Sequence, residues 1–219
     1  MGRTNIEWTE MSWSPITGCS KISTGCRNCY AERMAKRLAG RYGYPEQPNH
    51  FDVTLHKDKL DQPFHWKKPR TIFVCSMGDL FHEDVPDDYI FDVLDVITQN
   101  GPCYLRQTED DPEGTFWQGH TFQVLTKRPE RMRAIMGEWI CRVDNNMTGL
   151  LSEMFEWYTM EYGHYLPHLW LGVTAENQEM ANARIPYLLR TSAAIRFVSI
   201  EPMLGAILTN LIAAEVLNK

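Results

Sequence analysis

The stretch Leu169-Trp-Leu-Gly-Val173, followed by a helical pattern through Glu179 to Leu189 and then by Ile195-Arg-Phe-Val-Ser-Ile200, decides the fold. The two apolar runs have the length and composition of buried strands, and the segment between them has the length of a helix. A strand, a helix and a second strand in this order form a βαβ unit, in which the strands are parallel.

The same alternation extends toward the N-terminus. Ile72-Phe-Val-Cys75 and Thr121-Phe-Gln-Val-Leu125 are predicted strands, the first followed by a helix over Asp87 to Gln99 and the second by a helix that opens at Pro129. The remaining elements are a weaker strand near Ser12–Ile16 and a helix from Tyr30 to Leu38. We therefore expect one domain over residues 1–219, an α/β fold built as a partial, open barrel of parallel strands.

Composition and charge narrow the classes of function. The net charge of −6 gives no global basic field that would attract nucleic acid, although a local basic patch is compatible with it. The N-terminal residues lack the apolar region of a signal peptide, and no apolar run approaches the roughly 20 residues that cross a bilayer. The sequence thus predicts a cytoplasmic protein without a membrane partner.

Two stretches interrupt the alternation of strands and helices, at about residues 100–119 and 137–167. The first contains the acidic run Glu109-Asp-Asp-Pro-Glu-Gly, and the second is rich in aromatic residues. We interpret both as insertions. They either cover a functional site or form packed excursions at the surface.

Three of the six cysteines form the pattern C-x6-C-x2-C: Cys19, Cys26 and Cys29. Small and polar residues fill the spacing, so one flexible loop can wrap three thiolates around a corner of an iron–sulfur cluster. Three protein thiolates leave one iron of a [4Fe–4S] cluster open, whereas electron-transfer ferredoxins normally supply four. The pattern predicts a [4Fe–4S] cluster. The scattered Cys75, Cys103 and Cys141 are expected to be packing residues.

Two other interpretations of the cysteines remain. Three thiolates and a distant histidine such as His50, His56 or His65 would form a zinc site, although zinc sites usually show paired CxxC knuckles. Alternatively, the three cysteines are free thiols.

The chain resembles a phage and bacterial family of unknown function that carries a three-cysteine motif and whose gene neighbours are called three-Cys-motif partner proteins. The similar stretches include Trp13-Ser-Pro-Ile-Thr-Gly-Cys19, Ser76-Met-Gly-Asp-Leu-Phe-His82, Leu125-Thr-Lys-Arg-Pro-Glu-Arg131 and Ser199-Ile-Glu-Pro202. That family is in turn similar to radical-SAM enzymes. The resemblance implies S-adenosylmethionine (SAM) as a second cofactor, and a three-Cys-motif partner protein and nucleic acid as candidate partners.

The chain departs from this family in its two insertions and in its C-terminal part. The family's closing strand and Gly-Gly-Glu-Ser-Gly segment are missing, and Ile207 to Leu217 has the pattern of a helix instead. This difference leaves open whether the barrel is complete and the protein active.

Polar residues follow each predicted strand, where ligands of parallel α/β sheets bind. Ser76, Gly78 and Asp79 follow the strand at 72–75, and Lys127 and Arg128 follow the strand at 121–125. Thr174 and Glu176 follow the strand at 169–173, and Glu201 follows the strand at 195–200. The segment of Ser76, Gly78 and Asp79 resembles the one that holds the SAM amine, where Gly78 allows a close approach and Asp79 suits an ammonium group. Lys127 and Arg128 suit a carboxylate, Thr174 and Glu176 suit ribose hydroxyls, and Glu201 suits either the ribose or the substrate. Taken singly, Asp79 equally suits a helix cap, and the two cations a solvated helix start.

Three functions are therefore in competition. The first is a radical-SAM-like iron–sulfur enzyme acting on an unknown substrate, with nucleic-acid modification or repair in a phage context suggested by the resemblance. The second is a zinc-stapled, non-enzymatic module that binds nucleic acid through a basic run at residues 57–70. The third is a truncated protein that holds the cluster without activity.

Overall fold

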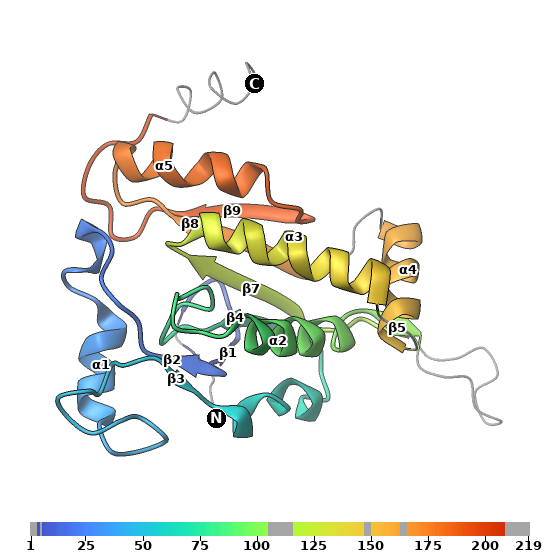
Figure 1. Ribbon diagram of the computed structural model, residues 1–219, viewed down its shortest axis with the longest axis horizontal. Coiled ribbons are helices and arrows are strands. Elements are labelled where there is room, and N and C mark those ends of the chain that lie inside the picture. Colours follow the sequence, from blue (N-terminus) through green and yellow to red (C-terminus); the bar gives the residue numbers. More distant parts are fainter. Residues whose placement is uncertain (1–3, 5, 105–115, 147–149, 163–165, 209–219) are drawn as a thin grey trace.

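A computed structural model describes residues 4, 6–104, 116–146, 150–162 and 166–208 (Figure 1). Its centre is a five-stranded sheet with the strand order β1-β4-β7-β8-β9, and every neighbouring pair is parallel. The strands are β1 (Met11–Trp13), β4 (Thr71–Val74), β7 (Thr121–Thr126), β8 (Leu169–Thr174) and β9 (Ile195–Ser199). The predicted α/β fold with parallel strands is thus confirmed. In place of the expected partial barrel, the described strands form an open sheet and no closed barrel.

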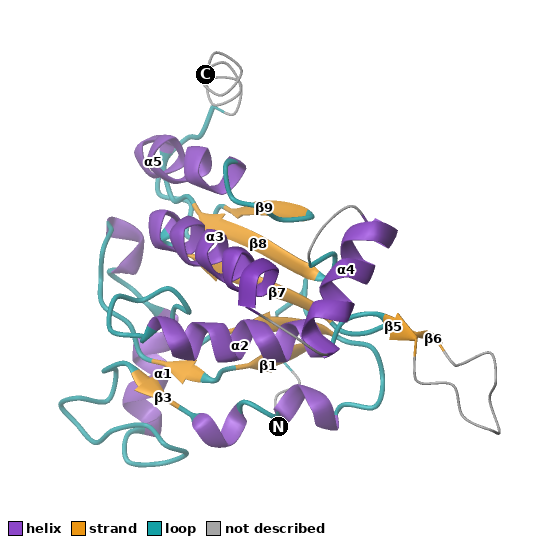
Figure 2. Cartoon of the chain, turned by 45° about the vertical axis from the view of Figure 1, so that its right-hand side comes forward, coloured by secondary structure: helices purple, strands orange, loops and turns teal. Residues whose placement is uncertain are grey.

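Three helices cover one face of this sheet. These are α2 (Asp87–Gln99), α3 (Pro129–Asn146) and α5 (Gln178–Leu189). In Figures 1 and 2, α2 and α3 lie in front of the strands, and α5 lies at the edge of the sheet formed by β9. The strand pleat explains the packing, because alternate side chains of a strand point to opposite faces. In β4, Ile72 and Val74 are buried in the main core, whereas Thr71 and Phe73 are only half-buried.

Helix α1 (Tyr30–Leu38) lies apart from this layer, at the end of the sheet where the central strands finish (Figure 1). It packs its alanines into a small separate cluster with Tyr44 and Met77. The bounds of α1 and α2 are those expected from the sequence. No helix in the described ranges is long and apolar enough to cross a membrane.

Short elements connect the larger ones. β2 (Ile16–Thr17) pairs with β3 (Thr54–Leu55), and β5 (Cys103–Tyr104) pairs with β6 (Phe116–Trp117), both antiparallel. The single-turn helices are η1 (Thr24–Cys26), η2 (Lys57–Lys59) and η3 (Gln62–His65). The weak strand expected near Ser12–Ile16 is divided between β1 and β2, because the chain leaves the sheet after Trp13.

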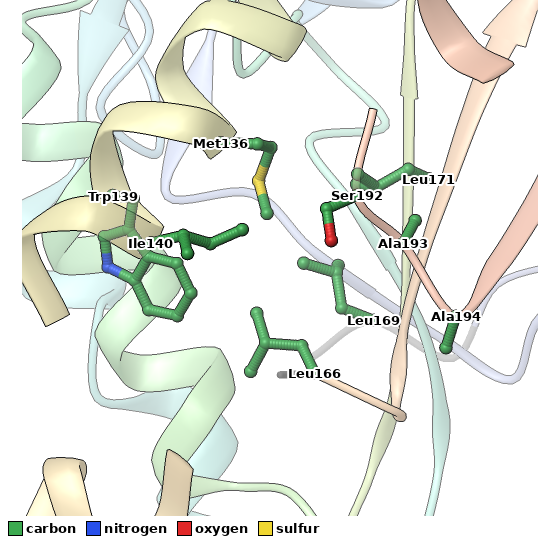
Figure 3. Close-up of a pocket in the computed structure, with 9 residues that line it drawn as sticks. All are labelled: Met136, Trp139, Ile140, Leu166, Leu169, Leu171, Ser192, Ala193 and Ala194. Atoms are coloured by element: carbon green, nitrogen blue, oxygen red, sulfur yellow. The ribbon is translucent and has the colours of Figure 1, made fainter. Parts of the chain in front are cut away.

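The described residues of the predicted insertion at 137–167 pack against the core. It contains the second half of α3 and a further helix, α4 (Leu150–Tyr162), which contacts α2 and α3. Trp139, Phe155 and Tyr158 are almost fully buried in the main core. Figure 3 shows a small pocket beside Trp139, lined almost entirely by apolar side chains of α3, β8 and the turn before β9. We regard this pocket as a packing gap.

The other predicted insertion, at 100–119, contains the β5–β6 hairpin, which projects from the end of the molecule away from α1 (Figure 1). The acidic run Glu109–Gly114 lies outside the described residues. The helix expected over Ile207–Leu217 also lies largely outside them, and Ile207 and Leu208 are not helical.

Candidate functional site

The loop that carries the three cysteines joins β2 to α1 and is fixed to the sheet at its first residue. Gly18 has a φ of +87°, and its N–H donates to the carbonyl of Met77 at 3.0 Å. A Cβ atom at Gly18 would lie 2.1 Å from the carbonyl oxygen of Asp52, so no larger residue fits. This close approach brings Cys19 to the residues that follow β4.

A pocket of about 580 Å³ lies between this loop and the carboxyl ends of the strands. Cys19, Cys26 and Cys29 all line it. The predicted strand-end residues that also line it are Ser76, Gly78, Asp79, Lys127, Arg128, Thr174 and Glu201. Parallel strands end at the same edge of a sheet, which explains why residues far apart in the sequence meet here.

Asp79 and Arg128 form a buried ion pair within this pocket, with 3.2 Å between Oδ2 and Nη1. The Asp79 carboxylate also accepts from the Thr126 hydroxyl at 2.7 Å and from the N–H groups of Phe81 and Lys127. Four donors fill the acceptor positions of a carboxylate. Asp79 therefore ties the end of β4 to the end of β7, and it has no acceptor position left for the ammonium group expected from the sequence.

Arg128 is likewise occupied by the protein. Its Nε donates to both carboxylate oxygens of Glu83, at 2.8 and 2.9 Å, and its Nη2 donates to the Ser20 hydroxyl at 2.8 Å. Its Nη1 lies 3.4 Å from Cys19 Sγ. The guanidinium thus fastens the cysteine loop to the sheet, which leaves Lys127 as the cation better suited to a ligand carboxylate.

His82 holds the same loop from the other side. Its Nε2 lies 2.8 Å from the Ser20 hydroxyl, and its Nδ1 accepts from the N–H of Asp84. Burial lowers the pKa of His82, and the charge of Arg128 adds to this effect. His82 is a structural neighbour of the cysteine loop and does not line the pocket.

Glu176 is the one predicted strand-end residue that does not line the pocket. It is fully buried, and its Oε1 accepts from the N–H of Gly25 at 3.2 Å, in the middle of the cysteine loop. Its Oε2 accepts from Arg184 at 2.8 Å, and Arg184 also donates to the carbonyl of Thr174. Glu176 is thus a loop anchor, which replaces its expected contact with a ribose hydroxyl.

Lys127 differs from these neighbours because its side chain is uncommitted. It lines the pocket and is half-buried, and its ammonium has no hydrogen-bond or ion-pair partner in the described part of the chain. Ser76 is paired through its hydroxyl with that of Ser12 on the neighbouring strand β1.

The three thiols are free and half-buried. Burial raises the pKa of Cys19 to about 11, helped by the charge of Asp79. Burial also acts to raise the pKa of Cys26, but hydrogen bonds at Ile22 and Ser23 hold it below its ordinary value. Metal binding would release the Cys19 proton, since only thiolates ligate metals.

The three thiols line the same pocket, but they do not point at a common metal position. Among the described residues no group of three His, Cys, Asp or Glu side chains is close enough to hold a single metal ion. Three thiols facing one pocket are the right donors for an iron–sulfur cluster, and the glycines of the loop give it freedom to close around one.

The histidines considered for a zinc site are elsewhere. His50, His56 and His65 do not line the pocket. His56 is buried and bonded to the Thr17 hydroxyl at 2.8 Å, and His65 pairs with Asp61. The structure therefore gives no support to a zinc ligand set that includes one of them.

The pocket also has an apolar wall that the sequence did not single out. Trp8, Tyr30, Phe51 and Phe73 line it together with Leu125. Only the alternation of β4 pointed to Phe73, because Ile72 and Val74 are the core-facing residues of that strand.

Fold and pocket together define an α/β protein with an open parallel sheet and a three-thiol pocket at the carboxyl ends of its strands. The chain belongs to the family described as "Protein of unknown function (DUF5131)", whose model matches residues 3–107 and 114–216. No curated protein and no solved structure matches the chain.

Proposed function

We propose that this protein is an iron–sulfur enzyme of the radical-SAM type. In this proposal Cys19, Cys26 and Cys29 ligate a [4Fe–4S] cluster, and the adjoining part of the pocket binds SAM. The observation that carries the proposal is the meeting of three free thiols with polar residues from four strand ends around one pocket of about 580 Å³. A pocket of this size accommodates a ligand as large as a nucleoside derivative.

Three thiolate ligands leave one iron open to a substrate or cofactor. When bound, such a cluster would supply the single electron for the reductive cleavage of SAM, the chemistry that initiates hydrogen-atom abstraction from a substrate. The protein's part is to bind, orient and shield the reactants.

Individual residues suit the parts of SAM to different degrees. The uncommitted ammonium of Lys127 suits the carboxylate of the methionine part. The backbone at Ser76 and Gly78 suits its amine, because Gly78 allows a close approach. Thr174 is a hydrogen-bonding group for the ribose hydroxyls, and Glu201 is one for either the ribose or the substrate. Asp79, Arg128 and Glu176 support this arrangement by holding the cysteine loop and the strand ends in place.

The test is anaerobic reconstitution with iron and sulfide, followed by metal analysis and by incubation with SAM and dithionite. We expect a brown protein with four irons per chain and production of 5′-deoxyadenosine. Cys19→Ala, Cys26→Ala and Cys29→Ala should each abolish the cluster. Cys141→Ala, which changes an exposed cysteine outside the pocket, is the matched control and should retain it.

Each other outcome identifies one of the competing functions. Stoichiometric zinc in a colourless protein contradicts the proposal and favours the zinc-stapled module. A stable cluster without cleavage of SAM favours a cluster-binding protein that lacks the chemistry.

A further inference from the structure

An aromatic group lies on the face of the sheet opposite the helices. The rings of Trp8 and Phe73 are 4.8 Å apart between centroids and meet edge to face, and the Phe197 ring lies 6.3 Å from Trp8. Gly172 leaves the space for this group, because a Cβ atom at that position would lie 2.5 Å from the Phe197 ring. Because β8 carries no side chain there, Phe197 of β9 leans across it toward Trp8.

This group is only partly covered. Trp8 is 40% exposed, and both Trp8 and Phe73 line the pocket that contains the cysteines. Phe73 lies within β4, whereas Ser76 and Gly78 lie beyond its end, so the aromatic rings are displaced along the sheet from the polar strand-end groups. The pocket therefore has a polar rim and, deeper along the sheet, an aromatic shelf formed by Trp8 and Phe73.

Glu201 gives the shelf a chemical preference. It follows β9, the strand that carries Phe197, and it lines the same pocket. Its carboxylate has no hydrogen-bond or ion-pair partner among the described residues. An ionised carboxylate only accepts hydrogen bonds. Because it lines the same pocket as the aromatic shelf, it favours flat rings with N–H donors on their edge, such as the amino group of cytosine.

We propose that the aromatic shelf binds a nucleobase of the substrate, stacked on Trp8 and hydrogen-bonded through its amino edge to Glu201. The inference rests on the proposed function and names the substrate class for it: a nucleoside unit, free or within a nucleic acid, distinct from the bound SAM. Stacking on an aromatic side chain is nearly indifferent to the identity of the base, whereas the carboxylate discriminates between bases.

The experiment uses the full chain without cluster and measures binding of cytidine, uridine and adenosine by equilibrium dialysis. Cytidine carries an amino group where uridine carries a carbonyl, so we expect cytidine and adenosine to bind more tightly than uridine. Trp8→Leu should weaken all three by about 5- to 150-fold, and Trp8→Phe should retain most of the affinity. Glu201→Gln should remove the preference for cytidine over uridine and leave uridine nearly unchanged.

The matched control is Phe64→Leu, which changes an aromatic residue that is 48% exposed and outside the pocket, and it should bind like the parent chain. Absence of nucleoside binding at about 10 mM in the parent chain overturns the inference. Equal binding by Trp8→Leu and the parent chain, with both folded by circular dichroism, also overturns it.

A third set of measurements distinguishes a nucleobase of the substrate from the adenine of SAM as the group that binds to the shelf. If SAM displaces the nucleosides competitively and Trp8→Leu weakens SAM to the same degree, the shelf holds the adenine of SAM and the inference is wrong. If the nucleosides bind as expected but reconstituted protein never cleaves SAM, the proposed function fails while the nucleobase site stands.

Discussion

The carboxyl group of Glu176 occupies the space in which a side chain at Gly25 would lie. The Gly25 N–H donates to Glu176 Oε1 at 3.2 Å, and a Cβ atom at Gly25 would be 2.9 Å from Glu176 Cδ. The middle of the cysteine loop is therefore held by a buried carboxylate that follows β8. That carboxylate is in turn held by Arg184 of α5.

This arrangement predicts a large stability loss for Glu176→Gln. The substitution removes the negative charge opposite the buried Arg184 and should lower the free energy of unfolding by about 3 kcal/mol. Urea denaturation measures the change. Glu179→Gln alters an exposed residue of α5, the helix that carries Arg184, and should stay within about 0.5 kcal/mol of the parent chain. Equal stability of the two variants would show that the Glu176–Arg184 pair is dispensable.

The same contact predicts a specific effect of Gly25→Ala on the cysteine loop. The added methyl group must displace either the loop or the Glu176 carboxylate, so we expect less iron per chain after reconstitution with little change in helix content. Gly137→Ala, in α3, meets no atom within 4 Å and should load iron normally while stabilising the protein by about 0.5–1 kcal/mol. Full loading of Gly25→Ala would mean that Glu176 moves aside at little cost.

Arg128 should not tolerate a change to lysine. One ammonium group cannot reproduce the fork that reaches Glu83, Asp79 and Ser20 together. We expect Arg128→Lys to lower the free energy of unfolding by about 1–3 kcal/mol, measured in urea, because it weakens the pairing of the buried Asp79 carboxylate. Arg133→Lys, at an exposed position of α3, the helix that follows Arg128, is the control and should be neutral. A neutral Arg128→Lys would contradict the anchoring role.

Lys127 should behave in the opposite way. Lys127→Ala should leave stability and cluster content unchanged, since its ammonium holds nothing in the described part of the chain. It should weaken SAM binding roughly tenfold or more, the loss expected for one charge-assisted hydrogen bond. Isothermal titration with SAM measures this, and Lys36→Ala, on the exposed side of α1, is the control. Unchanged affinity would remove Lys127 from the proposed SAM site.

The burial of His168 leads us to expect a loss of stability in acid. It is buried, its Nε2 donates to the carbonyl of Ile97 at 2.8 Å, and burial lowers its pKa to about 4. In the unfolded chain His168 therefore binds a proton near pH 6.5, whereas in the folded chain it does so only near pH 4. The stability contributed by neutral His168 is full above pH 6.5 and falls by about 3 kcal/mol as the pH drops to 4.

Urea denaturation between pH 7 and pH 4 tests this. His168→Gln should flatten the dependence of stability on pH, whereas His65→Gln changes an exposed histidine and should not. A parallel decline in all three proteins would assign the acid sensitivity to other groups.

The strands and the site's location followed from the sequence because they depend on local patterns. Apolar runs separated by helical segments predict parallel strands, and parallel strands bring their following residues to one edge. Ser76, Lys127, Thr174 and Glu201 reached the same pocket for this reason.

The roles within the site did not follow in the same way. Arg128 and Cys19 are 109 positions apart, and Gly25 and Glu176 are 151 apart, so their pairing depends on tertiary packing that leaves no local signal. The aromatic stretch at 137–167 was similarly ambiguous. Its composition suits a cover as well as a core, and only contacts such as Tyr158 with Thr98 decide the matter.

Because β9 lies at the edge of the sheet, the two walls of the pocket should differ in local stability. Ser199 ends β9 and Glu201 follows it, and β9 borders only β8 among the described strands. The opposite wall is built on β4 and β7, each flanked on both sides. Amide hydrogens of β9 should therefore exchange with solvent sooner than those of β7, because an edge strand opens without disturbing the rest of the sheet.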